Sequence, residues 1–396
     1  MRKKLPLLAK IGIAIVSGIL CGLFFPLWTT RIFATFNSIF SSFLGFCIPL
    51  IILGLIVSGI ADMGKGAGKM LLLTVALSYG FTLLAGFGTW AASSLVYPGL
   101  LGDTTLTAMS TDATEIEPYF TFAIPPLMNV TSALVLAFIL GLSIPAVGGN
   151  GTIKRFFEDF KDVVMLVIIK AIIPLLPLYI FGIFLQMSVN GQIKTVLVVF
   201  VKIIVFLFIL TVIMLLIQFI IAGIVSRRNP FRMLGSMLSA YVTALGTSSS
   251  AATIPVTLRS AIKTGVSPAV ANFVIPLCAT IHLSGSTIKI VGLSLAMMML
   301  SGMPIDTGVF AGFIFLLGVT MIAAPGVPGG AIMSALGLLT SILGLGEAQI
   351  GLIIAIYLAI DSFGTATNVT GDGAIANIVD TVWNSSLKKS HADGRL

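Results

Sequence analysis

The chain has 396 residues, of which 57% are hydrophobic and only 9% are charged, with a formal net charge of +8. A soluble protein of this length carries about a quarter charged residues, so the composition excludes an ordinary soluble enzyme and indicates a polytopic membrane protein. The basic residues lie in short loops between apolar runs. They therefore serve as topology signals and do not form a nucleic-acid-binding face.

The cysteines and the N-terminus carry no separate function. Cys21, Cys47 and Cys278 lie in apolar runs at spacings that match no metal motif, so we expect small buried apolar residues. The N-terminal MRKKLPLLAK precedes an apolar run, as a signal peptide would, but no clear small-residue cleavage site follows. We therefore expect a retained first span.

Apolar runs of spanning length fill the first part of the chain, near 8–29, 33–61, 70–97, 120–147, 162–189 and 195–225. Each is long enough to cross about 30 Å of hydrocarbon at about 1.5 Å per residue.

Charges in the connecting loops are distributed unequally between the two sides. The basic residues on one side are Lys3, Lys4, Lys65, Lys69, Lys154, Arg155, Lys161, Arg227, Arg228 and Arg232. The other side has Arg31 and Lys194 but also Asp103, Asp112, Glu115 and Glu117. The positive-inside rule then predicts a cytoplasmic N-terminus in the inner (plasma) membrane. An even number of spans places the C-terminus in the cytoplasm too.

The pattern changes after residue 230. TALGTSSSAATIP (243–255) and AAPGVPGGAIM (323–333) put small, polar and Gly/Pro residues inside apolar stretches. A lipid-facing helix of this content would expose unsatisfied backbone groups, so such segments must be buried or line a wet cavity. We expect two re-entrant hairpins, arranged as inverted repeats around a midplane site. Two kinked spans packed through small residues remain the alternative.

A polar face follows near the C-terminus. Asp361, Thr365, Asn368 and Asp372 recur at helical spacing and therefore share one face of a helix. Ionisable residues inside a span are costly and mark functional sites. The alternative is that these groups only hold the bundle together.

The segment PLCATIHLSGSTIK (276–289) presents a second polar face. His282, Gly285 and Lys289 share that face, with Ser286 beside them. His282 is either a hydrogen-bonded packing residue or a ligand. Lys289 must either find a carboxylate, with Asp361 and Asp372 as candidates, or reach an interface with its ammonium group.

Three motifs resemble one family. TALGTSSSAATIPVT, GVPGGAIM and TNVTGDGAIANIV are similar to the hairpin tips and last helix of the dicarboxylate/amino acid:cation symporters, the glutamate-transporter family. The resemblance covers nearly the whole chain and is strongest from 230 to 383. It implies an all-α polytopic membrane protein with eight transmembrane helices and two re-entrant helical hairpins, assembled as a homotrimer in membrane lipid.

The resemblance also implies a scaffold and an elevator-type transport domain that slides across the membrane, with the outer hairpin as a gate. The expected divisions are 1–67 (scaffold helices 1 and 2), 68–98 (transport-domain helix 3), 118–192 (scaffold helices 4 and 5), 193–384 (transport domain, with hairpins near 230–260 and 307–340) and 385–396 (cytoplasmic tail).

Site residues follow from the resemblance position by position. The implied substrate-binding residues are Ser248, Ser249, Ser250, Ser286, Val327, Gly329, Asp361, Gly364, Thr365 and Asn368. Asp361 would bind the α-amino group of the substrate and Asn368 its α-carboxylate. The implied sodium ligands, partly through backbone carbonyls, are Cys278, His282, Asn368 and Asp372. Sodium is the expected coupling ion, and no other cofactor is expected.

Departures from the family pattern point to the substrate. Members that carry acidic substrates have an Arg where this chain has Gly364 or Thr247, and that Arg pairs with the side-chain carboxylate. We therefore favour a small neutral amino acid such as serine, threonine or alanine, with Gly364 opening space beside the site. The alternative is a symporter of glutamate, aspartate or a dicarboxylate, possible because Lys289 could supply a cation for an acidic side chain. In this alternative the coupling ion could be a proton.

Further departures concern a third sodium. An Asp of the family is Ser284 here, a second Asp is Tyr357, and Phe81 lies near an expected hydroxyl. We predict that the third sodium is absent, with Lys289 placing an ammonium where a cation would otherwise lie. The second hairpin has Gly-Gly where many members have Gly-Ala-Gly, so its tip residues are defined only to within one position.

Two rival functions are disfavoured. An intramembrane aspartyl protease needs two carboxylates about 3 Å apart, whereas Asp361 and Asp372 on one helix would be about 16 Å apart. A channel needs a continuous polar path, whereas these motifs are hairpin gates over a closed site. We therefore expect a carrier and not an enzyme.

Overall fold

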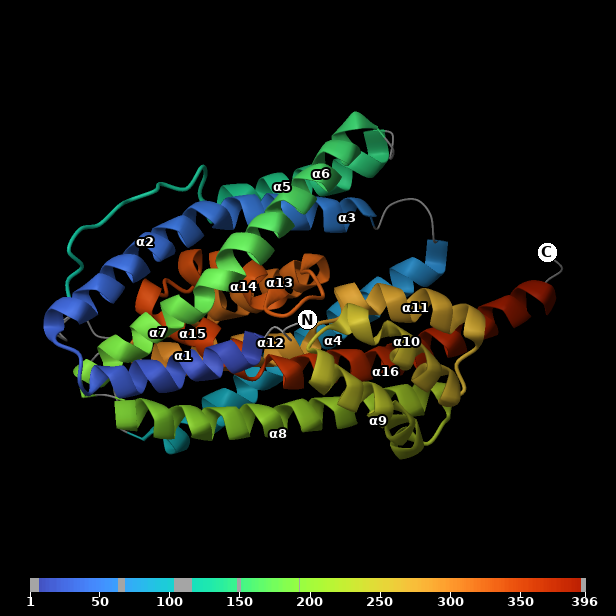
Figure 1. The fold of residues 1–396 in the computed structure, drawn as a ribbon. Helices are drawn as coiled ribbons and strands as arrows, with labels where there is room; N and C mark the ends of the chain where they lie inside the picture. Colours follow the sequence, from blue (N-terminus) through green and yellow to red (C-terminus); the bar gives the residue numbers. More distant parts are fainter. Residues whose placement is uncertain (1–6, 63–67, 103–115, 148–150, 192, 393–396) are drawn as a thin grey trace, which may run out of the picture.

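The computed structural model describes residues 7–62, 68–102, 116–147, 151–191 and 193–392. Helices make up all of its regular structure within these ranges (Figure 1). Several of the predicted loop charges, Lys3, Lys4, Lys65, Asp103, Asp112 and Glu115, lie outside the described residues.

The helices run in this order: α1 (Leu7–Gly22), α2 (Leu27–Ile52), the π-helical η1 (Leu53–Val57), α3 (Ser58–Asp62), α4 (Gly68–Leu101), α5 (Val130–Val147), α6 (Thr152–Val167), the π-helical η2 (Ile168–Ile172), α7 (Ile173–Val189), α8 (Ile193–Ser226), α9 (Pro230–Thr247), α10 (Ser250–Lys263), α11 (Pro268–Ile281), α12 (Ser284–Leu300), α13 (Thr307–Ala323), α14 (Gly330–Ser341), α15 (Glu347–Ala359) and α16 (Asp361–Ala392).

The prediction of an all-α polytopic membrane protein is confirmed over the described residues. Five helices there are long and apolar enough to cross a membrane, and the bent pair α15–α16 gives a sixth. The shorter apolar helices include α1, α5, α13 and α14, so the total of eight spans stays a prediction.

One predicted boundary, the start of the span near 120–147, is wrong. Residues 120–129 are not helical, and α5 begins only at Val130. Pro125 and Pro126 account for this, because proline lacks an amide donor and restricts the residue before it. At the other end of the chain, α16 continues as far as Ala392, into the segment 385–396 that is expected to be the cytoplasmic tail; that expectation stays a prediction.

Each re-entrant segment is a pair of short helices that packs back on itself, α9 with α10 and α13 with α14. The helices α10 and α14 have 14 and 12 residues, well short of the roughly 20 needed to span a bilayer. Asn229 caps α9 by accepting from the amides of Phe231 and Arg232. The kinked-span alternative is therefore wrong.

Two further helices are interrupted inside the bundle. The chain leaves helical geometry at His282 and Leu283, between α11 and α12. It bends by 62° at Ile360, between α15 and α16. Such breaks free backbone groups from helical pairing and are tolerated at membrane depth only in a protein interior. Both breaks lie next to predicted site residues.

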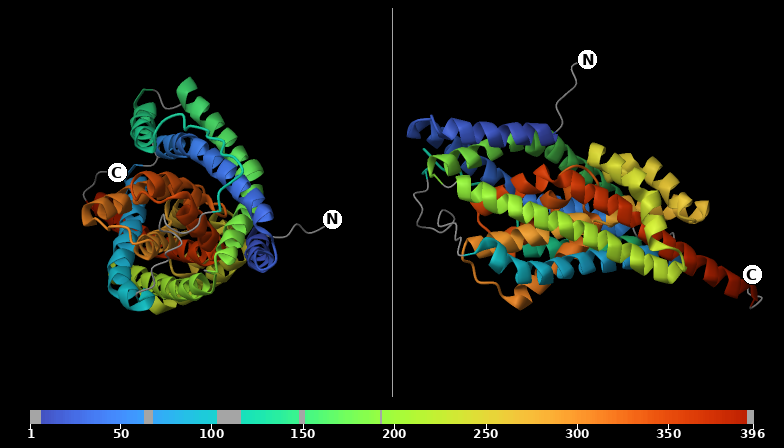
Figure 2. Two further views of the ribbon diagram at one scale, coloured as in Figure 1. Left: turned by 90° about the vertical axis from the view of Figure 1, so that its left-hand side faces the viewer. Right: turned by 90° about the horizontal axis from the view of Figure 1, so that it is seen from below.

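The helices pack in two groups. In the first, α1 and α2 pack on α7, and α5 packs on α3 and η1. In the second, α16 packs on α8, α9, α11 and α12, while α12 also packs on α4. Figure 2 shows the first group running along the side of the second. Movement of the second group against the first, as scaffold and transport domain, stays a prediction.

Candidate functional site

Both hairpin tips and α16 enclose one small cavity. Its lining residues are Ser248, Ser250, Leu283, Ser286, Pro325, Gly326, Val327, Ala331, Tyr357, Asp361, Thr365 and Asn368. Its volume of about 10 Å³ is roughly enough for one water molecule. Most of the predicted substrate-binding residues thus lie on one surface, and the hairpins are closed over it.

The tip of the first hairpin touches the second. Ser248 ends α9 in the left-handed conformation, with φ of 49°. Ser249 then caps α10 by accepting from the amide of Ala252 at 3.3 Å. The Ser249 hydroxyl also donates to the carbonyl oxygen of Gly326 at 3.3 Å. The N-terminus of α10, where amides point outward, therefore lies at the cavity.

The tip of the second hairpin is bonded to α16. Gly329 has φ of 76°, a conformation that favours glycine, and precedes α14. Its amide donates to Asp361 Oδ2 at 2.8 Å. Val327 lines the cavity itself, so both predicted tip residues are at the site.

Lys289 is the partner of Asp361. Its Nζ atom lies 2.8 Å from Asp361 Oδ1, and the two side chains are only 1% and 8% exposed. The same Nζ atom lies 3.7 Å from the centre of the Tyr357 ring, a favourable place for a cation. Of the two partners open from the sequence, Asp361 is the one found, and Lys289 does not reach an interface.

Two glycines make this pairing possible. A Cβ atom on Gly285 would lie 2.5 Å from the carbonyl oxygen of Gly364, so α12 and α16 cross in close contact here. A Cβ atom on Gly364 would lie 2.5 Å from Lys289 Nζ. The expectation that Gly364 opens space for substrate is therefore wrong, because the end of the Lys289 side chain fills that space.

The side chain of Asn368 is hydrogen-bonded to residues of α12. Its Oδ1 atom accepts from the amide of Gly285 at 2.8 Å, and its Nδ2 atom donates to Ser286 Oγ at 3.3 Å. The Tyr357 hydroxyl donates to the same Ser286 oxygen at 2.9 Å. Thr365 bonds the carbonyl of Asp361 at 3.0 Å. The remaining hydrogen on Asn368 Nδ2 is therefore available to a ligand in the cavity.

A second buried polar group surrounds Asp372, where sodium ligands were predicted. His282 Nδ1 lies 2.9 Å from Asp372 Oδ1, and both side chains are almost fully buried. Gln218 on α8 reaches His282 Nε2 at 3.4 Å and donates to Ser284 Oγ at 3.1 Å. Sequence reasoning missed Gln218. Its signal was a lone amide inside the apolar run VIMLLIQFII.

Two oxygens of this group have no hydrogen-bond partner among the described residues, Asp372 Oδ2 and Gln218 Oε1. Buried polar atoms are nearly always paired, so these can take a ligand. The thiol of Cys278 lies 3.8 Å from Ser78 Oγ, and its carbonyl accepts from the amide of His282. Over the same residues, no cluster of three or more His, Cys, Asp or Glu side chains forms a transition-metal site.

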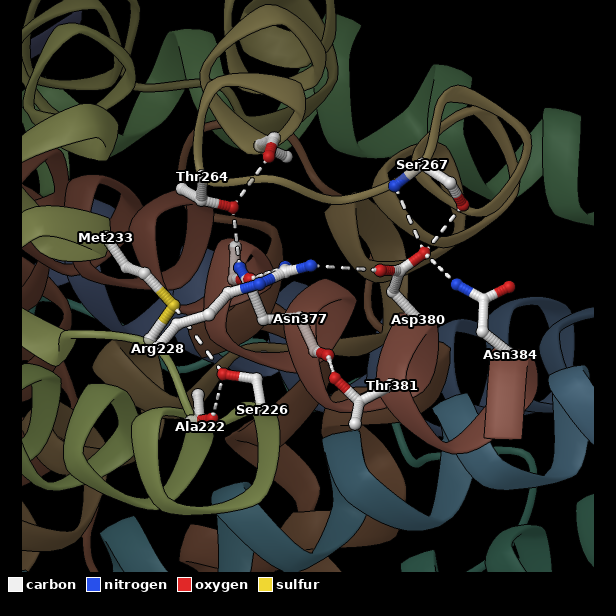
Figure 3. Close-up of polar contacts among 12 residues, drawn as sticks. Ala222, Ser226, Arg228, Met233, Thr264, Ser267, Asn377, Asp380, Thr381 and Asn384 are labelled. Carbon is white, nitrogen blue, oxygen red and sulfur yellow. Dashed lines mark hydrogen bonds and ion pairs between the residues drawn. The ribbon is translucent and has the colours of Figure 1, made fainter. Parts of the chain in front are cut away.

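A third polar group anchors the base of the first hairpin (Figure 3). Arg228, between α8 and α9, donates to Asn377 Oδ1 at 2.7 Å and lies 3.6 Å from Asp380 Oδ2. Ser267, between α10 and α11, donates to Asp380 Oδ1 from both its amide and its hydroxyl. Both ends of the hairpin are thus tied to α16.

The fold and site define a class, a polytopic membrane carrier with two re-entrant hairpins closed over a buried polar cavity. The chain belongs to the sodium:dicarboxylate symporter family, whose model matches residues 7–382. The resemblance seen in the hairpin and α16 motifs is therefore confirmed.

Named relatives include carriers of several substrate classes. The serine/threonine transporter SstT of Acinetobacter baumannii is 28% identical over 95% of this chain and 97% of its own length. Excitatory amino acid transporter 1 of Rattus norvegicus is 29% identical over 66% of this chain and 48% of its own. Neutral amino acid transporter A of Bos taurus is 26% identical over 67% and 51%.

Proposed function

We propose that this chain is a secondary active symporter, and not an enzyme, that couples uptake of a small neutral amino acid to a cation gradient. The substrate resembles serine, threonine or alanine, and the ion is sodium. One observation carries the proposal: Asp361 and Asn368 lie on one face of α16, in a cavity closed by both hairpin tips. The full-length similarity to a transporter named for serine and threonine supports it.

The cavity offers complementary groups for the two ends of an amino acid. The α-ammonium group pairs with the carboxylate of Asp361. The α-carboxylate takes the Asn368 amide and the free amides at the N-terminus of α10, because helix N-termini favour anions. The closed tips keep water away from these pairs, which strengthens them.

The charges near the site favour a neutral substrate. Lys289 and Asp361 cancel each other within 2.8 Å. A zwitterion adds no net charge to this buried site, whereas an acidic substrate adds an anion with a high desolvation cost. The cavity side chains of Ser286 and Thr365 suit a small hydroxyl or methyl group.

Sodium would bind around Asp372. Its unpartnered Oδ2 atom and the backbone carbonyls near the α11–α12 break are oxygen ligands, the kind a hard cation prefers. The residues that the resemblance places at a third sodium have other partners: Ser284 accepts a hydrogen bond from Gln218, and the Phe81 ring lies 6.3 Å from that of His282. We infer a lower sodium stoichiometry.

The transport cycle follows the elevator scheme. The group of α4 and α8–α16 moves against α1–α3 and α5–α7, with the second hairpin as the gate. We further propose that the chain forms a homotrimer in the lipid of the plasma membrane, with both termini in the cytoplasm. Its ligands are one amino acid and sodium.

A second candidate function rests on Lys289. If its ammonium turned from Asp361 toward the cavity, it would pair with a side-chain carboxylate, and the substrate would be glutamate, aspartate or a dicarboxylate. Competition decides between the two candidates: glutamate displaces bound serine only if the second is correct.

Thermal-shift screening of all twenty amino acids, with and without sodium, tests the proposal. We expect serine, threonine or alanine to raise the unfolding temperature, and to do so more strongly in sodium than in choline. Stabilisation by glutamate and aspartate alone would favour the second candidate. No shift with any amino acid in either salt would contradict both.

A further inference from the structure

Both oxygens of the Asp361 carboxylate already accept a hydrogen bond in the closed cavity. Its Oδ1 atom accepts from Lys289 Nζ at 2.8 Å, and its Oδ2 atom accepts from the amide of Gly329 at the same distance. The ammonium group of a substrate needs one of these oxygens. Two ammonium groups beside one buried carboxylate would repel each other strongly, because Lys289 and Asp361 are only 1% and 8% exposed. Lys289 and the substrate ammonium are therefore alternative cations for this carboxylate.

Lys289 also has somewhere to go. An apolar cavity of about 230 Å³ lies between α8, α12 and α16, on the outer side of the Lys289 side chain. Its lining residues are Ile204, Val205, Leu207, Phe208, Thr211, Lys289, Ile360 and Phe363. The flexible methylene groups of Lys289 can shift along this wall when another cation takes the carboxylate of Asp361. The ammonium itself then needs a polar partner, and the Asp361 carbonyl oxygen lies 3.5 Å from Nζ.

We propose that Lys289 is a tethered cation that replaces the substrate ammonium group on Asp361 whenever the carrier is empty. The proposal deepens the proposed function and rests on it for the identity of the competing ligand. In the empty state the ammonium of Lys289 neutralises Asp361, and the amide of Gly329 holds the second hairpin closed on the same carboxylate.

The energetic reason is the cost of burial. A hairpin that closes over an unpaired carboxylate must desolvate a bare charge, which is far more costly than burying a matched pair. With Lys289 in place, the empty site closes without a free cation from solution. Ligands that lack an ammonium group cannot displace Lys289, so it also acts as a specificity-determining residue.

Internal competition makes a clear prediction for affinity. The apparent dissociation constant of a substrate equals its intrinsic constant divided by the fraction of carriers in which Lys289 is not on Asp361. Removing the ammonium should therefore tighten substrate binding, whereas removing a group that binds the substrate should weaken it.

The first experiment compares Lys289→Met with Lys202→Met as the matched control. Lys202 lies on α8, and the one partner of its ammonium among the described residues is the Leu100 carbonyl at 3.4 Å. Isothermal titration with serine should give at least tenfold tighter binding for Lys289→Met and no change for Lys202→Met. At least tenfold weaker binding by Lys289→Met would overturn the proposal and make Lys289 a substrate ligand. An unchanged affinity would overturn it too.

The second experiment needs no amino acid. Cysteine labelling at Val327→Cys, with Cys21, Cys47 and Cys278 replaced by alanine, reports whether the second hairpin is closed. When Lys289 is present, we expect the cysteine at position 327 of the empty carrier to be protected from labelling. In Lys289→Met the same cysteine should be labelled at least tenfold faster. Millimolar ethylammonium should restore the protection in Lys289→Met. Equal labelling with and without Lys289 would overturn the proposal.

Serine titration and cysteine labelling together distinguish a failure of the proposed function from a failure of the Lys289 proposal. If serine and every other amino acid fail to bind the wild-type chain, the proposed function is wrong, and labelling still decides whether Lys289 closes the hairpin. If Lys289→Met does not fold, Lys289→Gln takes its place, because it keeps a hydrogen-bond donor near Asp361 but carries no charge. The same faster labelling and the same rescue by ethylammonium are expected.

Discussion

Lys289 on α12 occupies the space that Gly364 on α16 leaves by having no side chain. A Cβ atom at position 364 would lie 2.5 Å from Lys289 Nζ. The cation at this site is therefore supplied by α12 and accommodated by α16, and a side chain at position 364 would displace it.

Gly364→Ala tests that relationship. The added methyl group displaces the ammonium from Asp361, and we expect a loss of about 1–3 kcal/mol in unfolding free energy, as for overpacking of a core. Thermal unfolding in detergent measures it. Gly312→Ala on α13, where a Cβ meets no atom within 4 Å, is the control and should not destabilise. Adding Lys289→Ala to Gly364→Ala should restore stability; a further loss would contradict the pairing.

Asp361→Asn separates stability from binding. The substitution leaves the buried ammonium of Lys289 without its carboxylate, which costs about 3–5 kcal/mol when a buried pair is broken. We expect a lower unfolding temperature and no amino acid binding by isothermal titration. The double variant with Lys289→Met should regain stability but not binding. Normal transport by Asp361→Asn would refute the assignment of the α-amino group to this carboxylate.

His282→Asn tests the ion site. His282 Nδ1 lies within hydrogen-bond distance of Asp372 Oδ1, and a bond to a charged group contributes about 1.5–3 kcal/mol. Removing the imidazole frees that oxygen for sodium, so the sodium concentration for half-maximal substrate binding should fall about tenfold. Ser294→Ala on α12, whose hydroxyl bonds only its own helix, is the control. A higher sodium requirement would show that the imidazole is needed to form the site.

Arg228→Ala tests the anchor of the first hairpin. The change removes the cation beside Asp380, whose side chain is only 4% exposed, and the bond to Asn377. We expect a loss of about 1–3 kcal/mol in stability, since a buried polar partner is left incompletely paired. Substrate affinity should change less than twofold, because Arg228 does not line the cavity. Arg232→Ala, at an exposed position on α9, is the control and should change neither stability nor substrate affinity.

The sequence was sufficient to predict the polar face of α16 and the two hairpins. Side chains such as Asp361 and Asn368 share a face through helical periodicity alone, and glycines and prolines inside apolar runs mark broken helices. The choice between Asp361 and Asp372 as partner of Lys289 could not be made from sequence, because it depends on how α12 crosses α16.

Packing between distant helices accounts for the other misses. Gln218 joins His282 only because α8 lies against the α11–α12 break, a contact between residues 64 apart in the chain. The space beside Gly364 was expected to be open, since no spacing rule shows that the Lys289 side chain fills it. The span expected to begin at residue 120 was misplaced because apolar content outweighed two consecutive prolines.

Uptake into proteoliposomes tests the central claim most directly. Purified protein is reconstituted, an inward sodium gradient is imposed, and accumulation of labelled serine is followed beside labelled glutamate. The account predicts sodium-driven serine accumulation that unlabelled threonine or alanine inhibits, that Asp361→Asn abolishes, and whose reversal potential corresponds to fewer than three sodium ions. Glutamate accumulation without serine uptake, serine uptake that is indifferent to sodium, or a three-sodium stoichiometry would contradict it.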